Sequence, residues 1–381
     1  MMILDYGTLR LIWWVLLGVL LIGFAVMDGF DLGVGALLPF VAKKEDERRI
    51  AINTIGPVWE GNQVWLLLGG GAIFAAWPPL YAVAFSGFYL AMFLVLSALI
   101  LRPVGFKFRS KIADARWRSI WDGALFLGGF IPALIFGVAV GNMLRGVPFR
   151  FDDTLRLTYE GGLIGLLNPF ALLCGLVSVA MLTLHGAAYL TLKAGEPVAK
   201  RAAGFAKWAA LALVVLFTIG GVWVAFKLDG YVVTQSLGPD APSNPTLKQV
   251  AVKTGALIDN YGLYPWMLGA PALTYVCAPL AVWFLHLRRP GYAFISTGVA
   301  VAGVIATAGL SAFPFLLPSS LDPNASLTVF DASSSRLTLL IMLTATLVFL
   351  PIVLAYTAWV YRVLRGRVTA EWVAQNSSSI Y

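Results

Sequence analysis

Charged side chains are scarce in this sequence of 381 residues: only 12% are Asp, Glu, Lys or Arg, while 59% are hydrophobic. A typical soluble domain has about 25% charged and about 45–50% apolar residues. So few charged residues cannot coat a globule of this size in water. This excludes a soluble enzyme, a disordered protein and a nucleic-acid-binding protein. The composition predicts an integral membrane protein.

Cysteine and histidine are also scarce, with two of each. Cys174 and Cys277 lie in apolar runs and form no C-x-x-C pair, so we expect free thiols and no disulfide framework. His185 and His286 each lie near a basic residue at the end of an apolar run, which favours an interfacial position over metal or haem ligation. With so few ligands, we expect no metal site and no cofactor bound by the chain's own residues.

Long apolar segments, by contrast, are abundant. A helix needs about 20 mostly apolar residues to cross about 30 Å of hydrocarbon. We therefore predict an all-α integral membrane protein with about nine transmembrane helices in a single domain over residues 1–381. The predicted spans are Leu9–Val26, Ile55–Ala76, Leu80–Leu101, Ile120–Met143, Gly162–Leu192, Phe205–Phe226, Leu263–Leu285, Ala293–Leu316 and Leu337–Tyr361.

The basic residues indicate the orientation of these spans. The loops at 43–49, 102–118, 193–207 and 288–289, with the tail at 362–381, carry 19 of the 27 Lys and Arg residues. Loops rich in Lys and Arg face the cytoplasm in most membrane proteins. The N-terminus is therefore expected outside and the C-terminus in the cytoplasm, which agrees with an odd number of spans.

Several carboxylates fall in or beside the apolar segments, where charge is costly and suggests a functional site by default. Asp28 and Asp31 are three residues apart, so a helix places them on one face. Two interpretations stay open for this pair: a place on a proton path, or a helix end that satisfies interfacial charge and packing. Asp122 follows a basic cluster at the start of a predicted span, where an acid favours the helix macrodipole.

Among these acids, Glu60 is the strongest candidate for a role in proton transfer. It lies in Trp59-Glu60-Gly61-Asn62-Gln63-Val64-Trp65, near the start of the second predicted span. Gln63 shares its face at i+3, and Trp59 and Trp65 are expected to shield it from lipid. Desolvation disfavours the ionised form of such an acid, which suits proton exchange near neutral pH. The alternative is a hydrogen-bonded role in helix packing.

Taken together and in this order, the motifs of the chain resemble those of subunit II of the cytochrome bd-type quinol oxidases. The resemblance covers almost the whole length. The motifs are Leu9-Arg10-Leu11-Ile12-Trp13-Trp14, Met27-Asp28-Gly29-Phe30-Asp31-Leu32-Gly33, the run from Trp59 to Trp65, Phe85-Ser86-Gly87-Phe88-Tyr89, Arg102-Pro103-Val104-Gly105-Phe106, Gly146-Val147-Pro148-Phe149, Asp229-Gly230-Tyr231, Phe313-Pro314-Phe315, Pro318-Ser319-Ser320 and Asn324-Ala325-Ser326-Leu327-Thr328.

The resemblance implies two four-helix bundles at about 1–143 and 144–316, a peripheral helix at about 337–361 and a cytoplasmic tail at 362–381. It implies a similarly folded subunit I as partner, which holds two b-type haems and one d-type haem, in a bacterial inner membrane. Such a complex oxidises quinol and reduces O2 to water, and it generates a proton motive force without pumping. Whether a structural quinone or a small single-helix accessory subunit belongs to it stays open; lipid, quinol and O2 are the other expected contacts.

The resemblance also implies roles for single residues. Glu60 would lie on a proton route towards the haem pair of subunit I, although many relatives carry Asp at this position. Asp28 and Asp31 are further candidates for the proton path. The residues expected to support the route, or to border an oxygen path, are Trp59, Trp65, Asn62 and Gln63.

Two other functions remain alternatives. Buried carboxylates and glycine-rich helices also suit a proton-coupled secondary transporter, which would work without a haem-bearing partner. A purely structural assembly subunit would use the same acids for packing alone.

Overall fold

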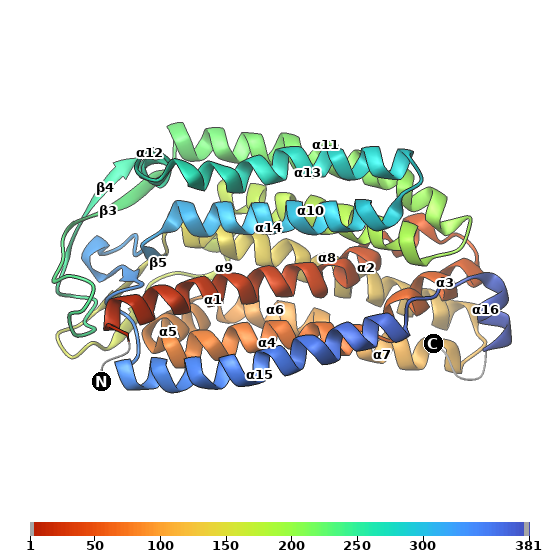
Figure 1. The fold of residues 1–381 in the computed structure, drawn as a ribbon, viewed down its shortest axis with the longest axis horizontal. Coiled ribbons are helices and arrows are strands. Elements are labelled where there is room, and N and C mark those ends of the chain that lie inside the picture. The colour runs from red at the N-terminus through yellow and green to blue at the C-terminus, as the bar shows by residue number, and fades with distance from the viewer. Residues whose placement is uncertain (1–3, 377–380) are drawn as a thin grey trace.

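The computed structural model describes residues 4–376 and 381. Its helices run side by side along the long axis of the molecule (Figure 1). At one end of this axis, which we call the hairpin end, lie the strands β3 (Asp229–Gln235), β4 (Gln249–Thr254) and β5 (Phe315–Leu317). At the other, the α3 end, lie α3 (Glu45–Ile55) and α16 (Ala370–Gln375). Within the described residues, the chain starts at the hairpin end and Tyr381 lies towards the α3 end, as an odd number of crossings requires (Figure 1).

The helices and strands follow one another along the whole chain. The helices are α1 (Tyr6–Met27), α2 (Gly29–Val41), α3 (Glu45–Ile55), α4 (Trp59–Ala76), α5 (Pro78–Gly87), α6 (Tyr89–Leu99), α7 (Leu101–Phe108), α8 (Ala115–Arg145), α9 (Leu163–Leu166), α10 (Pro169–Lys193), α11 (Val198–Phe226), α12 (Asp259–Leu263), α13 (Gly269–His286), α14 (Pro290–Ala312), α15 (Arg336–Val363) and α16 (Ala370–Gln375). The strands are β1 (Phe149–Phe151), β2 (Leu157–Tyr159), β3 (Asp229–Gln235), β4 (Gln249–Thr254), β5 (Phe315–Leu317) and β6 (Leu327–Thr328).

Eight helical segments of the described residues are long and apolar enough to cross a membrane. The remaining predicted span, Ile55–Ala76, corresponds to α4, which has 18 residues and reaches about 27 Å. Its first turns carry Glu60, Asn62 and Gln63 and lower its apolar character. The all-α membrane fold is confirmed, and α4 is the span that length and hydropathy alone identify least well.

Several predicted boundaries are wrong, and local chemistry explains them. The first span extends over Tyr6–Val41 and is broken only at Asp28, between α1 and α2. The fifth begins at Pro169 because Asn168 caps the helix, accepting a hydrogen bond from the Ala171 N–H. The eighth ends at Ala312, since Pro314 forces Phe313 into an extended conformation. Residues 315–317 then form β5 instead of continuing the helix.

The predicted third span, Leu80–Leu101, is divided into α5 and α6 by a break at Phe88, and α7 follows it after a second break at Ile100. The segments between α11 and α12 and between α14 and α15 contain short antiparallel strand pairs: β3 pairs with β4, and β5 pairs with β6. The described part of the tail packs on the helices: α16 contacts α3, and the Asn53 side-chain amide donates to the Tyr381 carbonyl oxygen at 2.8 Å. Residues 377–380 of the predicted tail lie outside the described part of the chain.

Helix α10 occupies the centre of the molecule and packs against α2, α8, α11 and α14. α13 packs on α14 and α11, while α1 packs on α4, α14 and α15. α6 and α7 cover α8. α15 lies along α1 and α4 and is the most exposed of the candidate spans in the described residues (Figure 1).

Glycines let α2 approach two neighbouring helices very closely. A Cβ atom on Gly33 would lie 2.0 Å from the Leu182 carbonyl oxygen of α10. A Cβ atom on Gly129 of α8 would lie 2.5 Å from the Leu32 carbonyl oxygen. Because no side chain fits at these contacts, α2 is enclosed by its neighbours and its two aspartates are buried.

Candidate functional site

Asp28 and Arg102 form a buried ion pair. Asp28 lies at the break between α1 and α2, and Arg102 lies in α7. The Arg102 guanidinium donates from Nη2 to Asp28 Oδ1 at 2.8 Å and from Nη1 to Oδ2 at 3.1 Å. The Arg102 side chain is 2% exposed and the Asp28 side chain 0%. A bidentate pair of this kind satisfies both carboxylate oxygens of Asp28.

Asp31 shares this guanidinium less closely. Its Oδ2 lies 3.9 Å from Arg102 Nη2 and accepts a hydrogen bond from Asn62 Nδ2 at 2.8 Å. Asn62 Oδ1 in turn accepts from the Tyr361 hydroxyl at 2.7 Å. Polar contacts therefore run from α2 through α4 to α15. Asp31 Oδ1 has no hydrogen-bond partner among the described residues.

The two predicted tryptophans both point into the chain. Trp59 is buried, and the Arg102 Cζ atom lies 5.8 Å from its ring centroid. Its ring also lies 5.4 Å from that of Phe106. Trp65 packs against α1, where a Cβ atom on Gly23 would lie 2.6 Å from its ring. Trp59 therefore covers the buried ion pair, and Trp65 fixes α4 against α1.

Glu60 lies apart from this cluster. Its side chain is 66% exposed and pairs with Lys107 of α7, whose Nζ lies 3.9 Å from Glu60 Oε1. Gln63 is half-buried. The prediction that Trp59 and Trp65 shield Glu60 is wrong, because both rings face the interior while Glu60 faces outward. The structure brings together Asp28, Asp31, Asn62 and Trp59, but not Glu60.

Sequence reasoning missed Arg102 and Tyr361 as members of the site. Arg102 belongs to a motif that supported the family resemblance, and it follows directly on an apolar run of α6. A cation in such a place requires a buried carboxylate partner. This requirement is the signal by which Arg102 could have been identified. Nothing local marks Tyr361, since its contact with Asn62 bridges 299 residues.

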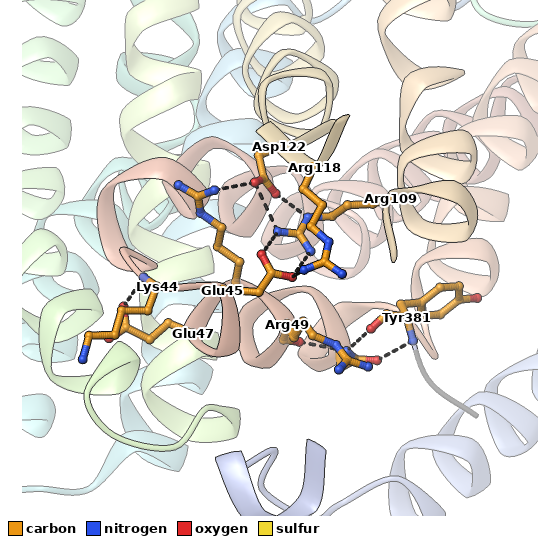
Figure 2. A network of polar contacts seen from close by, with 10 residues as sticks. Lys44, Glu45, Glu47, Arg49, Arg109, Arg118, Asp122 and Tyr381 are labelled. Atoms are coloured by element: carbon orange, nitrogen blue, oxygen red, sulfur yellow. Dashed lines mark hydrogen bonds and ion pairs between the residues drawn. The ribbon is translucent and has the colours of Figure 1, made fainter. Parts of the chain in front are cut away.

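A second polar network lies at the α3 end (Figure 2). Arg109 donates to Asp122 and, through both terminal nitrogens, to Glu45. Arg48 donates to Asp122 at 2.7 Å. The prediction that Asp122 favours the macrodipole of α8 is wrong, because the helix begins at Ala115 and Asp114 caps it. Asp122 instead joins α8 to α3 and to Arg109 in the short 3-10 turn that follows α7.

Glu47 links α3 to α11. Its Oε2 accepts from Arg201 Nη1 at 2.6 Å and from the backbone N–H groups of Lys43 and Lys44. The Arg201 guanidinium holds the pKa of Glu47 down at about 2, against the opposing effect of burial, and the two N–H groups add to the lowering. This carboxylate therefore stays ionised at neutral pH.

The prediction that His185 is interfacial is wrong. The ring is fully buried and stacks on Phe294, with centroids 4.7 Å apart. Nδ1 lies 2.7 Å from the Thr297 hydroxyl, and Nε2 lies 2.9 Å from the Val26 carbonyl oxygen. With both nitrogens engaged, this histidine does not fit haem ligation. His286 is exposed at the end of α13, as predicted.

Cys174 and Cys277 are free, as predicted. No group of three or more His, Cys, Asp or Glu side chains within residues 4–376 and 381 is arranged to hold a metal ion.

Comparison with known proteins agrees with this architecture. Residues 9–364 match the sequence family described as cytochrome bd terminal oxidase subunit II. The chain is 50% identical to the cytochrome bd-I ubiquinol oxidase subunit 2 of Escherichia coli strain K12, over 99% of this chain and 100% of the relative. It is 33% identical to the cytochrome bd ubiquinol oxidase subunit 2 of Bacillus subtilis strain 168, over 95% and 98%.

A solved structure supports the fold. The chain is similar to a chain of the bd oxidase from Geobacillus thermodenitrificans, with a TM-score of 0.69, 18% identity, and coverage of 94% of this chain and 98% of that chain. The family match extends over most of the sequence, and the alignment with the Escherichia coli relative covers nearly all of it. This chain therefore belongs to the cytochrome bd terminal oxidase subunit II family.

Proposed function

We propose that this chain is the haem-free subunit II of a terminal quinol oxidase, and that Glu60 lies where protons pass from this chain to its haem-bearing partner. The relatives named above support the first part, since they are subunits of ubiquinol oxidases. The outward position of Glu60 carries the second part.

The surroundings of Glu60 argue for a protein partner on this face. The outward-facing residues that follow it on α4, Val64, Leu67 and Leu68, are exposed and apolar. A carboxylate beside such a surface is costly in lipid. Lys107 at 3.9 Å is itself 59% exposed and offsets little of this cost. A subunit that covers α4 would remove Glu60 from lipid and provide a polar continuation for a proton.

In the proposed complex, quinol is oxidised and O2 is reduced to water, which generates a proton motive force. The haems, two of b type and one of d type, belong to the partner and supply the redox chemistry. This chain contributes a scaffold and an acid that takes up and releases protons. Gln63 and Trp59 are proposed as neighbours of the proton route, and Trp65 as a border of an oxygen path.

Asp28 and Asp31 are proposed to have different roles. Asp28 is proposed as structural, because its carboxylate is fully occupied by Arg102. Asp31, together with Asn62, remains a candidate for proton transfer. The bundle boundaries at about 143 and 316, the periplasmic N-terminus, a structural quinone and a small accessory subunit remain predictions.

Purification of the tagged chain in mild detergent tests the subunit assignment. We expect a haem-bearing chain to co-purify and to give a reduced-minus-oxidised spectrum of b- and d-type haems. Absence of any haem-bearing partner would instead favour the transporter alternative, which the family membership does not support.

The variant Glu60→Gln tests the proton role. We expect quinol oxidase turnover to fall by about tenfold or more, with haem content unchanged, because a proton-transferring side chain usually contributes about 10²–10⁴-fold to the rate. Glu60→Asp should retain most of the activity, and Glu160→Gln, an exposed acid in the loop after β2, is the matched control. Full activity in Glu60→Gln would exclude an essential proton role, and loss of haem would indicate a structural one.

A further inference from the structure

A small cavity lies beside the buried ion pair. It is lined by Asp31 and Arg102 and by apolar side chains that include Val34, Leu38, Ile52 and Phe106. The volume open to the centre of a water molecule is about 10 Å³. This is about the smallest space that holds one water molecule.

Asp31, which lines this cavity, has one oxygen atom without a hydrogen-bond partner among the described residues. This atom is Oδ1, and the Asp31 side chain is fully buried. A buried charged oxygen without a partner is strongly unfavourable. Asn62 cannot serve it, because its amide nitrogen already donates to Oδ2 and its oxygen accepts from Tyr361.

The charges around the cavity do not balance if Asp31 is ionised. Asp28 already uses both of its oxygens on Arg102, which lies 3.9 Å from Asp31. The other polar groups that face this region are neutral: Asn62 from α4, Tyr361 from α15 and Tyr189 from α10, whose hydroxyl donates to the Thr54 carbonyl. One negative charge would then remain buried without a partner of its own.

The residues that line the cavity indicate whether a metal cation or a proton neutralises this charge. A bound metal cation requires several oxygen ligands, about six for most hard cations. The cavity offers carboxylate oxygen from Asp31 alone, a guanidinium of the same charge as the ion, and otherwise apolar side chains. A proton needs no further ligands, and its carrier can donate to a single water molecule.

We propose that Asp31 is held as a neutral carboxylic acid, with its proton on Oδ1 directed to one water molecule in this cavity. Asp31 then forms a buried proton-holding site in the centre of the chain, separate from Glu60 on its outer face. The inference does not depend on the proposed function, because it concerns the resting protein and needs no turnover to be tested.

Infrared difference spectroscopy of the purified complex in H2O and D2O provides the test. We expect a band of a protonated carboxyl group that shifts to lower frequency in D2O. This band should be lost in Asp31→Asn and kept in Glu60→Gln. Absence of such a band from the wild-type spectrum, or its persistence in Asp31→Asn, would overturn the proposal.

A second pair of variants keeps the test decisive if Asp31→Asn does not assemble. Val34→Ile adds a methylene group at the cavity, whereas Val41→Ile adds one to a buried position of the same helix that does not line it. We expect deuterium exchange of the carboxyl band to slow in Val34→Ile and to match wild type in Val41→Ile. Equal exchange in both variants would contradict the water site.

Discussion

The ion pair between Asp28 and Arg102 shows how a single contact governs the centre of this protein. Both groups are buried in a region where a lone charge is very costly. They come from helices 74 residues apart in the chain, so neither can be satisfied before α2 and α7 have packed on α8. The pair is therefore a condition for correct assembly of these helices.

The variant Asp28→Asn should disrupt assembly because it leaves the Arg102 guanidinium without its close partner. Removal of one member of a buried pair costs about 3–5 kcal/mol. We expect little assembled complex by size-exclusion chromatography and haem absorbance. Asp153→Asn, at an exposed position, should behave as wild type. An intact but slow Asp28→Asn complex would assign Asp28 to proton transfer instead.

At this scale the sequence identified most of the residues but not their grouping. Hydropathy showed that Asp28, Asp31 and Glu60 lie in or beside apolar helices. Because successive helix residues are turned by about 100°, Glu60 and Asn62 must face different sides of α4. Which of these sides faces the interior depends on α1, α2 and α15, and so no local pattern could assign it.

Among the elements, α2 is tightly constrained by its neighbours. It is held between α8 and α10 at contacts where only glycine fits. These contacts fix the depth and rotation of α2, and hence the positions of Asp28 and Asp31 relative to Arg102.

The variant Gly33→Ala should therefore destabilise the protein. Its added methyl group would lie 2.0 Å from the Leu182 carbonyl oxygen, so α2 and α10 must move apart. We expect a loss of about 1–3 kcal/mol, typical of overpacking, measured as a lower thermal denaturation midpoint. Gly18→Ala, in the same long helix but with no atom within 4 Å of the new group, is the matched control. Equal stability of the two variants would contradict this role of Gly33.

Helix α3 is held by Glu47, which caps its N-terminus and pairs with Arg201 of α11. Because the native pKa of about 2 lies below the ordinary value of 4.5, the stabilisation by this carboxylate is present above about pH 4.5. It is lost as the pH falls towards 2.

Glu47→Gln should accordingly reduce stability by about 1–3 kcal/mol at pH 7, the usual range for hydrogen bonds to a charged group. The difference from wild type should shrink as the pH is lowered below 4.5. Thermal denaturation followed by tryptophan fluorescence at several pH values measures this, and Glu371→Gln, an exposed position on α16, serves as the control. A difference that does not change with pH would rule out the ionic origin of the effect.

For the whole molecule, the charges of the two ends differ. At the α3 end, Arg48, Arg109 and Arg201 pair with Asp122, Glu45 and Glu47. The predicted cytoplasmic position of this end rests on the distribution of Lys and Arg.

Labelling of introduced cysteines tests the orientation. Leu237→Cys lies in the exposed loop between β3 and β4, and Ala113→Cys lies in the exposed segment before α8. We expect a membrane-impermeant maleimide to label Leu237→Cys in intact spheroplasts, and Ala113→Cys only after the membrane is opened. The native Cys174 and Cys277 are replaced by alanine in both variants. The reverse pattern would invert the predicted topology.

The sequence by itself determined the membrane class, the approximate positions of the spans, the family and the presence of acids at depth. These properties depend on composition, hydropathy and local motifs, which are readable along one chain. It did not determine that α1 and α2 form one long helix broken at Asp28, that His185 is buried, or that Asp122 joins α8 to α3. The tertiary structure decided these features, and it also separated Glu60 from Asp28 and Asp31. The physical reason is that helix periodicity sets angles within an element, whereas burial and pairing depend on which distant helices pack against it.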